Sequence, residues 1–181
     1  MKKKNVIKLF TAIVIACAIV ISLPVFSQES TKLTDPEIAS VAVTANQIDI
    51  DYANIAKKKS TNADILKFAE TMAADHKAVI DQAVALVTKL NVTPKNNAVT
   101  EKYLADASKT KKALNSKSGN AFNKAYIDNE VAYHKAVINA VENVLIPDSQ
   151  NAELKSLLQN VLPVLKTHLE HAIMVQKTIS K

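Results

Sequence analysis

Glycine is almost absent from this sequence of 181 residues, in which Gly119 is the only one. Tight β-hairpin turns and the loops that bind nucleotide phosphates both depend on glycine, because it adopts positive φ angles without steric cost. Alanine, lysine, leucine, valine and asparagine dominate instead. The sequence therefore predicts a protein built from α-helices, without a nucleotide-binding loop.

Arginine and tryptophan are absent, and Cys17 is the only cysteine. Proteins use the planar guanidinium group of arginine for bidentate contacts with phosphates and bases, so nucleic acid is not an expected partner. Four of the 23 lysines lie before residue 9, and without them 19 lysines face 17 acidic residues, a net charge of only +2. A domain that lacks residues 1–27 also lacks Cys17, so it has neither disulfide bonds nor thiolate ligands for a metal.

The first 27 residues have the pattern of a secretory signal peptide. Four lysines precede an apolar run from Leu9 to Phe26, and a small residue, Ser27, follows the run. We expect this signal to be removed and the protein to work outside the cytoplasm. Residues 28–34 are then expected to form a flexible segment before a helical domain of residues 35–181.

Two alternatives are open for the same segment. Residues 14–17, with the sequence Val-Ile-Ala-Cys, resemble the cleavage site of bacterial lipoproteins, which would place a lipid anchor at Cys17. The residues after Cys17 stay apolar, however, where a lipoprotein usually becomes polar. Retention as a membrane anchor fits less well, because Ser22 and Pro24 interrupt the run.

Helix caps and apolar periodicity predict four long helices. These are expected to begin near Asp35, Thr61, Asn120 and Asn151, and a shorter, more polar helix is expected from Ala98 to about Ala113. Short links join the first helix to the second and the third to the fourth, so each pair should be an antiparallel hairpin. The predicted fold class is all-α, an antiparallel four-helix bundle with a short extra helix in the connection between helices two and three.

Three of the four histidines fall on apolar helix faces when each helix is drawn at about 100° per residue. His76 lies near the centre of the apolar face of the second helix, Glu130 and His134 lie within that of the third, and His168 within that of the fourth. All four are near the middle of their helices, so they can meet at one level. Neutral imidazoles and a carboxylate on facing helices are groups with which helical bundles hold divalent metals.

The sequence therefore predicts a site for one transition-metal ion (Zn, Cu, Ni or Fe) formed by these four residues. Gln47, Asp51, Asp75 and His171 lie at or near the borders of apolar faces, and we treat them as alternates or as supports of the ligands. A second interpretation is equally open: the same groups form a closed, hydrogen-bonded His–Glu cluster that fixes the register of the helices without a metal.

No nucleophile motif is visible, because the sequence has no glycine-flanked serine and no cysteine in the helical domain. It also shows no pair of carboxylates with distinct acid and base roles. Whether the protein is an enzyme is therefore open, and the sequence favours a protein without catalytic activity.

Several segments together resemble DUF4142, a family of exported bacterial proteins of unknown function. They are Ala45–Asp51, Phe68–Met72, Asp75-His76, Gly119–Phe122, Ala125-Tyr126, His134, Leu162–Leu165 and His168-Leu169. The resemblance implies a ferritin-like four-helix bundle in the periplasm or outer envelope, and it implies no reaction. The chain departs from the family in having Phe-Asn at residues 122–123, where Phe-Asp is usual, and aspartate at Asp49 or Asp51, where glutamate is usual.

The chain also departs from iron-binding ferritin-like proteins, which carry Glu-x-x-His motifs on two helices. Neither His76 nor His168 follows a glutamate at that spacing. The set is thus richer in histidine than a di-iron site, and a single Zn, Cu or Ni ion suits it better.

These observations predict an exported envelope protein whose buried His/Glu centre binds a transition metal, in metal handling or stress protection. The alternative is a metal-free structural or interaction module of the bacterial envelope with no catalytic activity. Its partner would be an envelope protein or an anionic surface that contacts the lysine clusters at residues 57–59 and 109–112. Association with a second copy of the chain is also open.

Overall fold

Helices joined by loops make up residues 32–180, which are the residues that this computed structural model describes. In chain order they are α1 (Asp35–Lys59), α2 (Ala63–Lys89), α3 (Ala98–Asn115), α4 (Gly119–Ala140), the π-helical turn η1 (Val141–Leu145), α5 (Ile146–Asp148) and α6 (Ala152–Ile179). In this part of the chain, no helix is both long and apolar enough to cross a membrane. The signal peptide expected at residues 1–27, with Cys17, lies outside the described residues, as does most of the segment expected at 28–34.

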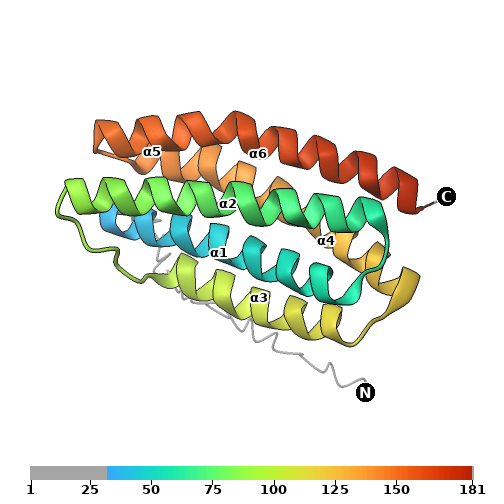
Figure 1. Ribbon diagram of the computed structural model, residues 1–181. Helices are drawn as coiled ribbons and strands as arrows, with labels where there is room; N and C mark the ends of the chain where they lie inside the picture. Colours follow the sequence, from blue (N-terminus) through green and yellow to red (C-terminus); the bar gives the residue numbers. More distant parts are fainter. Residues whose placement is uncertain (1–31, 181) are drawn as a thin grey trace, which may run out of the picture. The chain divides into compact units, whose positions relative to one another are not determined.

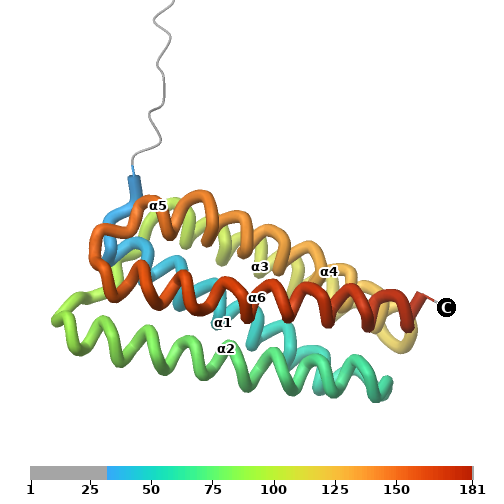
Figure 2. The backbone as a smooth tube through the Cα atoms, turned by 90° about the horizontal axis from the view of Figure 1, so that it is seen from above, coloured from blue at the N-terminus to red at the C-terminus, as the bar shows by residue number. Residues whose placement is uncertain are grey.

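The four long helices α1, α2, α4 and α6 form an antiparallel bundle (Figure 1). α1 packs along α2 and α4 packs along α6, so each pair is a helical hairpin, and the tube view shows the same pairs from above (Figure 2). α3 packs against α1 and carries the chain along the bundle from the end of α2 to the start of α4, so that α2 and α4 run in the same direction (Figure 1). The predicted all-α, ferritin-like four-helix bundle with an extra helix in this connection is confirmed.

The cap of α1 differs from the expected one. Thr34 precedes the helix, and the Glu37 carboxylate accepts hydrogen bonds from its backbone N–H at 3.0 Å and from its hydroxyl at 2.7 Å. Asp35, the expected cap, has another role: its carboxylate oxygens accept from the backbone N–H groups of Gln150 and Asn151, each at 2.9 Å. These two bonds tie the start of α1 to the loop before α6.

The start of α2 is also displaced by one residue from the expected cap, Thr61. Asn62 caps this helix instead, because its side-chain oxygen accepts from the backbone N–H of Ile65 at 3.1 Å. Such a bond satisfies one of the N–H groups that the first turn of any helix leaves without an intrahelical partner.

The third long helix changes its helix type near its end: α4 ends at Ala140 and a π-helical turn follows. In this turn the backbone N–H of Ile146 bonds to the carbonyl of Val141, five residues earlier. Wide turns of this kind are rare and are frequently found at functional sites. Here the turn faces the bundle interior through Val141 and Leu145, which are both buried.

Two apolar clusters fill the interior of the bundle. The first, called the Phe68 cluster, contains Phe68, Met72, Phe122, Tyr126, Ile127 and Ala172 among others, and the second, called the Ile38 cluster, contains Ile38, Val41, Val137, Val141, Leu145, Leu158 and Leu165 among others. Five buried polar residues lie where the two clusters meet along the helices, and we call them the polar layer: Asp49, His76, Glu130, His134 and His168. The bundle thus buries ionisable groups in its middle and apolar side chains on both sides of them.

We predict that replacing Asp35 by alanine lowers the free energy of unfolding by about 1 to 2 kcal/mol, because two backbone N–H groups before α6 lose a charged acceptor. Chemical denaturation followed by circular dichroism measures this change. Glu70→Ala, at an exposed position of α2, is the control and should change the free energy by less than about 0.5 kcal/mol. Equal effects of the two substitutions would contradict the assigned role of Asp35.

Candidate metal centre

All four helices of the bundle contribute to the polar layer. Asp49 comes from α1, His76 from α2, Glu130 and His134 from α4, and His168 from α6. Each has at most 4% of its surface exposed, and Asp49 and Glu130 have none. A buried ionised group costs several kcal/mol unless it has a partner, so the contacts of these side chains decide what the layer can do.

The protonation of His76 follows from its neighbour on α1. The side-chain nitrogen of Asn46 donates to the carbonyl of Ala42 at 2.8 Å, which turns the side-chain oxygen of Asn46 toward Nδ1 of His76, 2.7 Å away. That oxygen can only accept, so Nδ1 of His76 carries the proton. In a neutral ring Nε2 is then a free lone pair, and it is buried without a hydrogen-bond partner.

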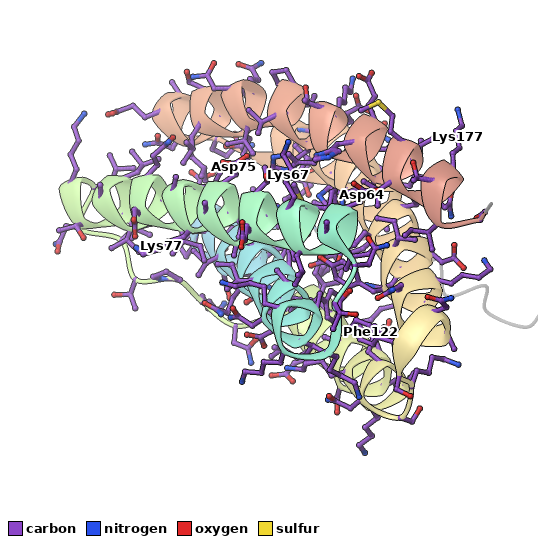
Figure 3. All side chains as sticks on the ribbon, turned by 45° about the vertical axis from the view of Figure 1, so that its right-hand side comes forward. Asp64, Lys67, Asp75, Lys77, Phe122 and Lys177 are labelled. Atoms are coloured by element: carbon purple, nitrogen blue, oxygen red, sulfur yellow. The ribbon has the colours of Figure 1, made fainter. Side chains whose placement is uncertain are left out.

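His134 and His168 follow the same arrangement. Nδ1 of His134 donates to the backbone carbonyl of Glu130 at 3.0 Å, and Nε2 of His168 donates to the carboxylate of Asp75 at 2.9 Å. The remaining nitrogens, Nε2 of His134 and Nδ1 of His168, are buried and unpartnered. Figure 3 labels Asp75 on the side of α2 that faces α6. Three imidazoles thus each donate one N–H to a fixed acceptor and keep the other nitrogen free, which is how metal-binding histidines are held.

The three rings form a nearly equilateral group, with centroids 5.7, 5.2 and 5.6 Å apart. His76, His134 and His168 can each offer one ring nitrogen such that the three atoms lie within 4.8 Å of one another. Oδ2 of Asp49 lies 3.2 Å from Nε2 of His76 and 3.5 Å from Nε2 of His134. Ligands around a tetrahedral ion with bonds of about 2.0 to 2.1 Å are separated by about 3.3 Å, so these distances suit a shared ion.

The two carboxylates of the layer differ in charge. Burial alone would raise the pKa of Asp49, but attraction to His76 and His134 outweighs burial and holds this pKa below its usual value. Burial raises the pKa of Glu130 well above its usual value, and the negative charge of Asp49 raises it further. Asp49 is therefore the charged carboxylate of the layer, and both of its oxygens lack a hydrogen-bond partner.

Burial has the opposite effect on two of the imidazoles. Burial lowers the pKa of His134, and the attraction of Asp49 only partly offsets this effect. Burial likewise lowers the pKa of His168, although its hydrogen bond to Asp75 acts in the opposite direction. The layer therefore combines a carboxylate that favours its charged form with two imidazoles that favour their neutral form, an arrangement that attracts a cation.

The structure brings together His76, Glu130, His134 and His168, the four residues that the sequence analysis selected as ligands. Asp49, Glu130 and His134 also form a group whose candidate ligand atoms lie within 4.8 Å of one another. Whether these groups bind a metal stays a prediction.

The four alternates lie around the layer rather than in it. Gln47 donates to Asp51 at 3.1 Å, and Asp51 pairs with Lys111 of α3 at 3.0 Å, so both residues belong to the contact between α1 and α3. Asp75 supports His168, as described above. His171 packs its ring edge-on against Phe68, with centroids 5.1 Å apart, and takes no part in the layer.

Asp49 and Asn46 were missed by the sequence analysis. Val41, Ile48 and Tyr52 form an apolar stripe at helical spacing along the first helix, and this stripe leaves Asp49 at its edge. Because α2, α3 and α4 all pack against α1, this helix is buried over a wider arc. A row of small residues at four-residue spacing, Ala45 and Ala53 on either side of Asp49, was the available signal, since small side chains allow close packing of helices.

We predict that Glu130→Gln stabilises the metal-free protein, and does so increasingly as the pH rises. The folded state holds a proton on Glu130 that the unfolded state releases near pH 4.5, so the wild type loses stability from about pH 4.5 up to the raised pKa. The stability difference between variant and wild type should grow by up to about 1.4 kcal/mol per pH unit in this window. Urea denaturation between pH 5 and 8 measures it.

The control for this prediction is Glu170→Gln, which removes an exposed carboxylate from α6. Its effect on stability should not vary with pH over the same range. A pH-independent difference for Glu130→Gln would show that Glu130 is ionised in the folded state at all these pH values.

Comparison with known proteins supports the fold and places the chain in a family. No curated protein matches the chain. Among solved structures, the chain is similar to one described as "CopM in the Cu(II)-bound form", with a TM-score of 0.60 and 15% sequence identity over 81% of this chain and 98% of that chain. At this identity the likeness shows a shared fold. The family described as "Domain of unknown function (DUF4142)" matches residues 22–175, and the chain belongs to this family.

Proposed function

We propose that this protein binds one divalent transition-metal ion in the polar layer and serves in metal handling outside the cytoplasm. The observation that carries the proposal is the set of three buried histidine nitrogens without partners, each on a ring whose other nitrogen is fixed by a hydrogen bond. In this proposal Nε2 of His76, Nε2 of His134 and Nδ1 of His168 are ligands, and Asp49 supplies a carboxylate oxygen.

The donor set limits the choice of metal. Three imidazoles and a carboxylate suit Zn(II), Cu(II), Ni(II) or Fe(II), whereas Cu(I) prefers thiolate and thioether ligands. The similar fold of a protein described in its Cu(II)-bound form supports Cu(II) as the first ion to test. Glu130, which lies next to His134, can join the ligands when a metal displaces its proton, because a divalent charge would offset the repulsion by Asp49.

The rival interpretation, a closed hydrogen-bonded cluster, is less consistent with these contacts. A closed cluster would pair its own polar atoms, whereas both oxygens of Asp49 and both of Glu130 lack a hydrogen-bond partner. Leaving a buried acceptor unpaired costs roughly 1 to 3 kcal/mol. One bound cation would satisfy several of these atoms at once, and no rearrangement of the helices is required.

Metal handling, rather than catalysis, is the simplest role for such a centre. Ligands from four helices in a buried layer favour retention of the ion, and the described residues contain no nucleophile motif beside it. Export is proposed from the amino-terminal sequence pattern at residues 1–27.

We predict that the preferred metal raises the melting temperature of the metal-stripped protein by about 5 to 10 °C when its free concentration is about 100 times Kd. Differential scanning calorimetry with Cu(II), Zn(II), Ni(II) and Fe(II) in turn measures this rise. The rise should disappear in Asp49→Asn and in the double variant His76→Ala/His168→Ala, because each removes proposed ligands.

His171→Ala is the matched control. It also removes a histidine from α6, but the ring of His171 contacts Phe68 and not the polar layer. This variant should keep the full metal-dependent rise, even if it is less stable. If no metal raises the melting temperature of the wild type, while the histidine variants are only less stable, the polar layer is structural and the metal proposal fails.

A further inference from the structure

A cavity adjoins the polar layer on the side of the Ile38 cluster. It has a volume of about 50 Å³, and its wall is almost wholly apolar. Small residues from different helices line it, including Ala42 and Ala45 of α1, Ala83 of α2 and Ala140 of α4. The Phe68 cluster on the other side of the layer contains buried aromatic rings, whereas the buried members of the Ile38 cluster are all aliphatic, so the two halves of the core differ in packing.

The size and lining of the cavity restrict what can occupy it. One water molecule needs roughly 10 to 15 Å³ of such volume, and apolar cavities of modest size stay dry. The cavity therefore suits an apolar molecule no larger than a few waters. Charged molecules are disfavoured, because the wall offers them almost no polar partner and Asp49 adds a negative charge at the inner end.

Three of the proposed ligands also line the cavity. Asp49, His76 and His134 are among its lining residues, together with Asn46, whereas His168 is not. A metal held in the polar layer would therefore be within reach of a molecule in the cavity. Such a molecule would become an additional ligand, a change of coordination number that four-coordinate ions of this type permit.

Two leucines lie between the cavity and a hollow on the surface. Leu86 of α2 and Leu157 of α6 line both the cavity and a surface hollow of about 380 Å³, whose wall includes the polar residues Gln82, Glu153 and Asn160. Both leucines are only partly buried. Rotation of these two side chains, a motion of picoseconds to nanoseconds at a surface, would connect the hollow with the cavity.

The π-helical turn borders the same space. Val141 and Leu145, the first and last residues of the turn, both line the cavity. A regular α-helix would place the residues after Ala140 at different angles around the helix axis, so the turn helps to shape this wall. Its position beside the proposed centre agrees with the occurrence of such turns near functional sites.

We propose that this cavity delivers a small neutral diatomic molecule, of the class of dioxygen or nitric oxide, to a metal held in the polar layer, where it would be an additional ligand. This inference rests on the proposed metal centre. Only reversible binding is proposed, and no bond of the diatomic molecule is broken.

Two probes test the cavity and the metal separately. Xenon, followed by ¹²⁹Xe NMR, reports on the cavity in the metal-free protein. Nitric oxide, added without oxygen to the full protein loaded with Co(II), reports on the metal through the visible absorption bands of Co(II), which change when a four-coordinate ion becomes five-coordinate. We expect xenon to bind, nitric oxide to change the spectrum, and azide at the same concentration to leave it unchanged.

Ala83→Leu is the decisive variant, since the larger side chain fills the cavity about 10 Å along α2 from His76 and leaves the proposed ligands in place. It should weaken binding of xenon and of nitric oxide at least tenfold while retaining Co(II). Ala42→Val narrows the opposite wall and serves in the same way if Ala83→Leu does not fold. Ala78→Leu, at an exposed position of α2, is the matched control and should behave like the wild type.

The outcomes separate this proposal from the one on which it rests. Xenon binding without a spectral change on adding nitric oxide would overturn delivery to the metal and leave the metal centre intact. An equal response to nitric oxide in Ala83→Leu would show that the molecule reaches the ion by another route, which also overturns the proposal. Failure of Co(II) and the other ions to bind would overturn the metal centre, and xenon would then still report whether the cavity is open.

Discussion

The charge of Asp49, enclosed on all sides and without a hydrogen-bond donor, is the constraint on which the rest of the structure depends. A carboxylate in this position requires a positive charge or a bound cation nearby, and His76 of α2 and His134 of α4 lie 3.2 and 3.5 Å from its Oδ2. The remaining features follow from this requirement. The side-chain oxygen of Asn46, the backbone carbonyl of Glu130 and the carboxylate of Asp75 each accept a hydrogen bond from one imidazole N–H. The other nitrogen of each ring is therefore free to bind a cation.

The two halves of the core support this layer differently. The Phe68 cluster combines buried aromatic rings with small side chains that fit between them, and the rings of Phe122 and Tyr126 lie parallel, 6.1 Å apart. The buried members of the Ile38 cluster are all aliphatic, two of them lie on the π-helical turn, and this cluster leaves space. Rigid packing on one side keeps the ligands in position, and looser packing on the other leaves one face of the layer accessible from within the protein.

Much of this arrangement could be predicted from the sequence, because it depends on periodicity along single helices. His76, Glu130, His134 and His168 lie on apolar faces near the middle of their helices, and the structure buries all four at one place. Asp49 could not be found in this way, since its burial depends on α3 and α4 covering more of α1 than one apolar stripe indicates. The hydrogen bond of Asn46 to His76 depends on the side-by-side register of α1 and α2, which a single sequence does not reveal.

The polar layer draws one or two residues from each helix of the bundle, spread from Asp49 to His168. No short segment holds the set, so an unfolded chain lacks the centre. A chain that emerges from a ribosome or a membrane channel amino terminus first presents His168 after the other four residues of the layer. A chain that crosses a membrane unfolded would arrive without an ion. The compartment in which folding is completed, with its own supply of metals, would then decide which ion the protein receives, whatever the order of intrinsic affinities.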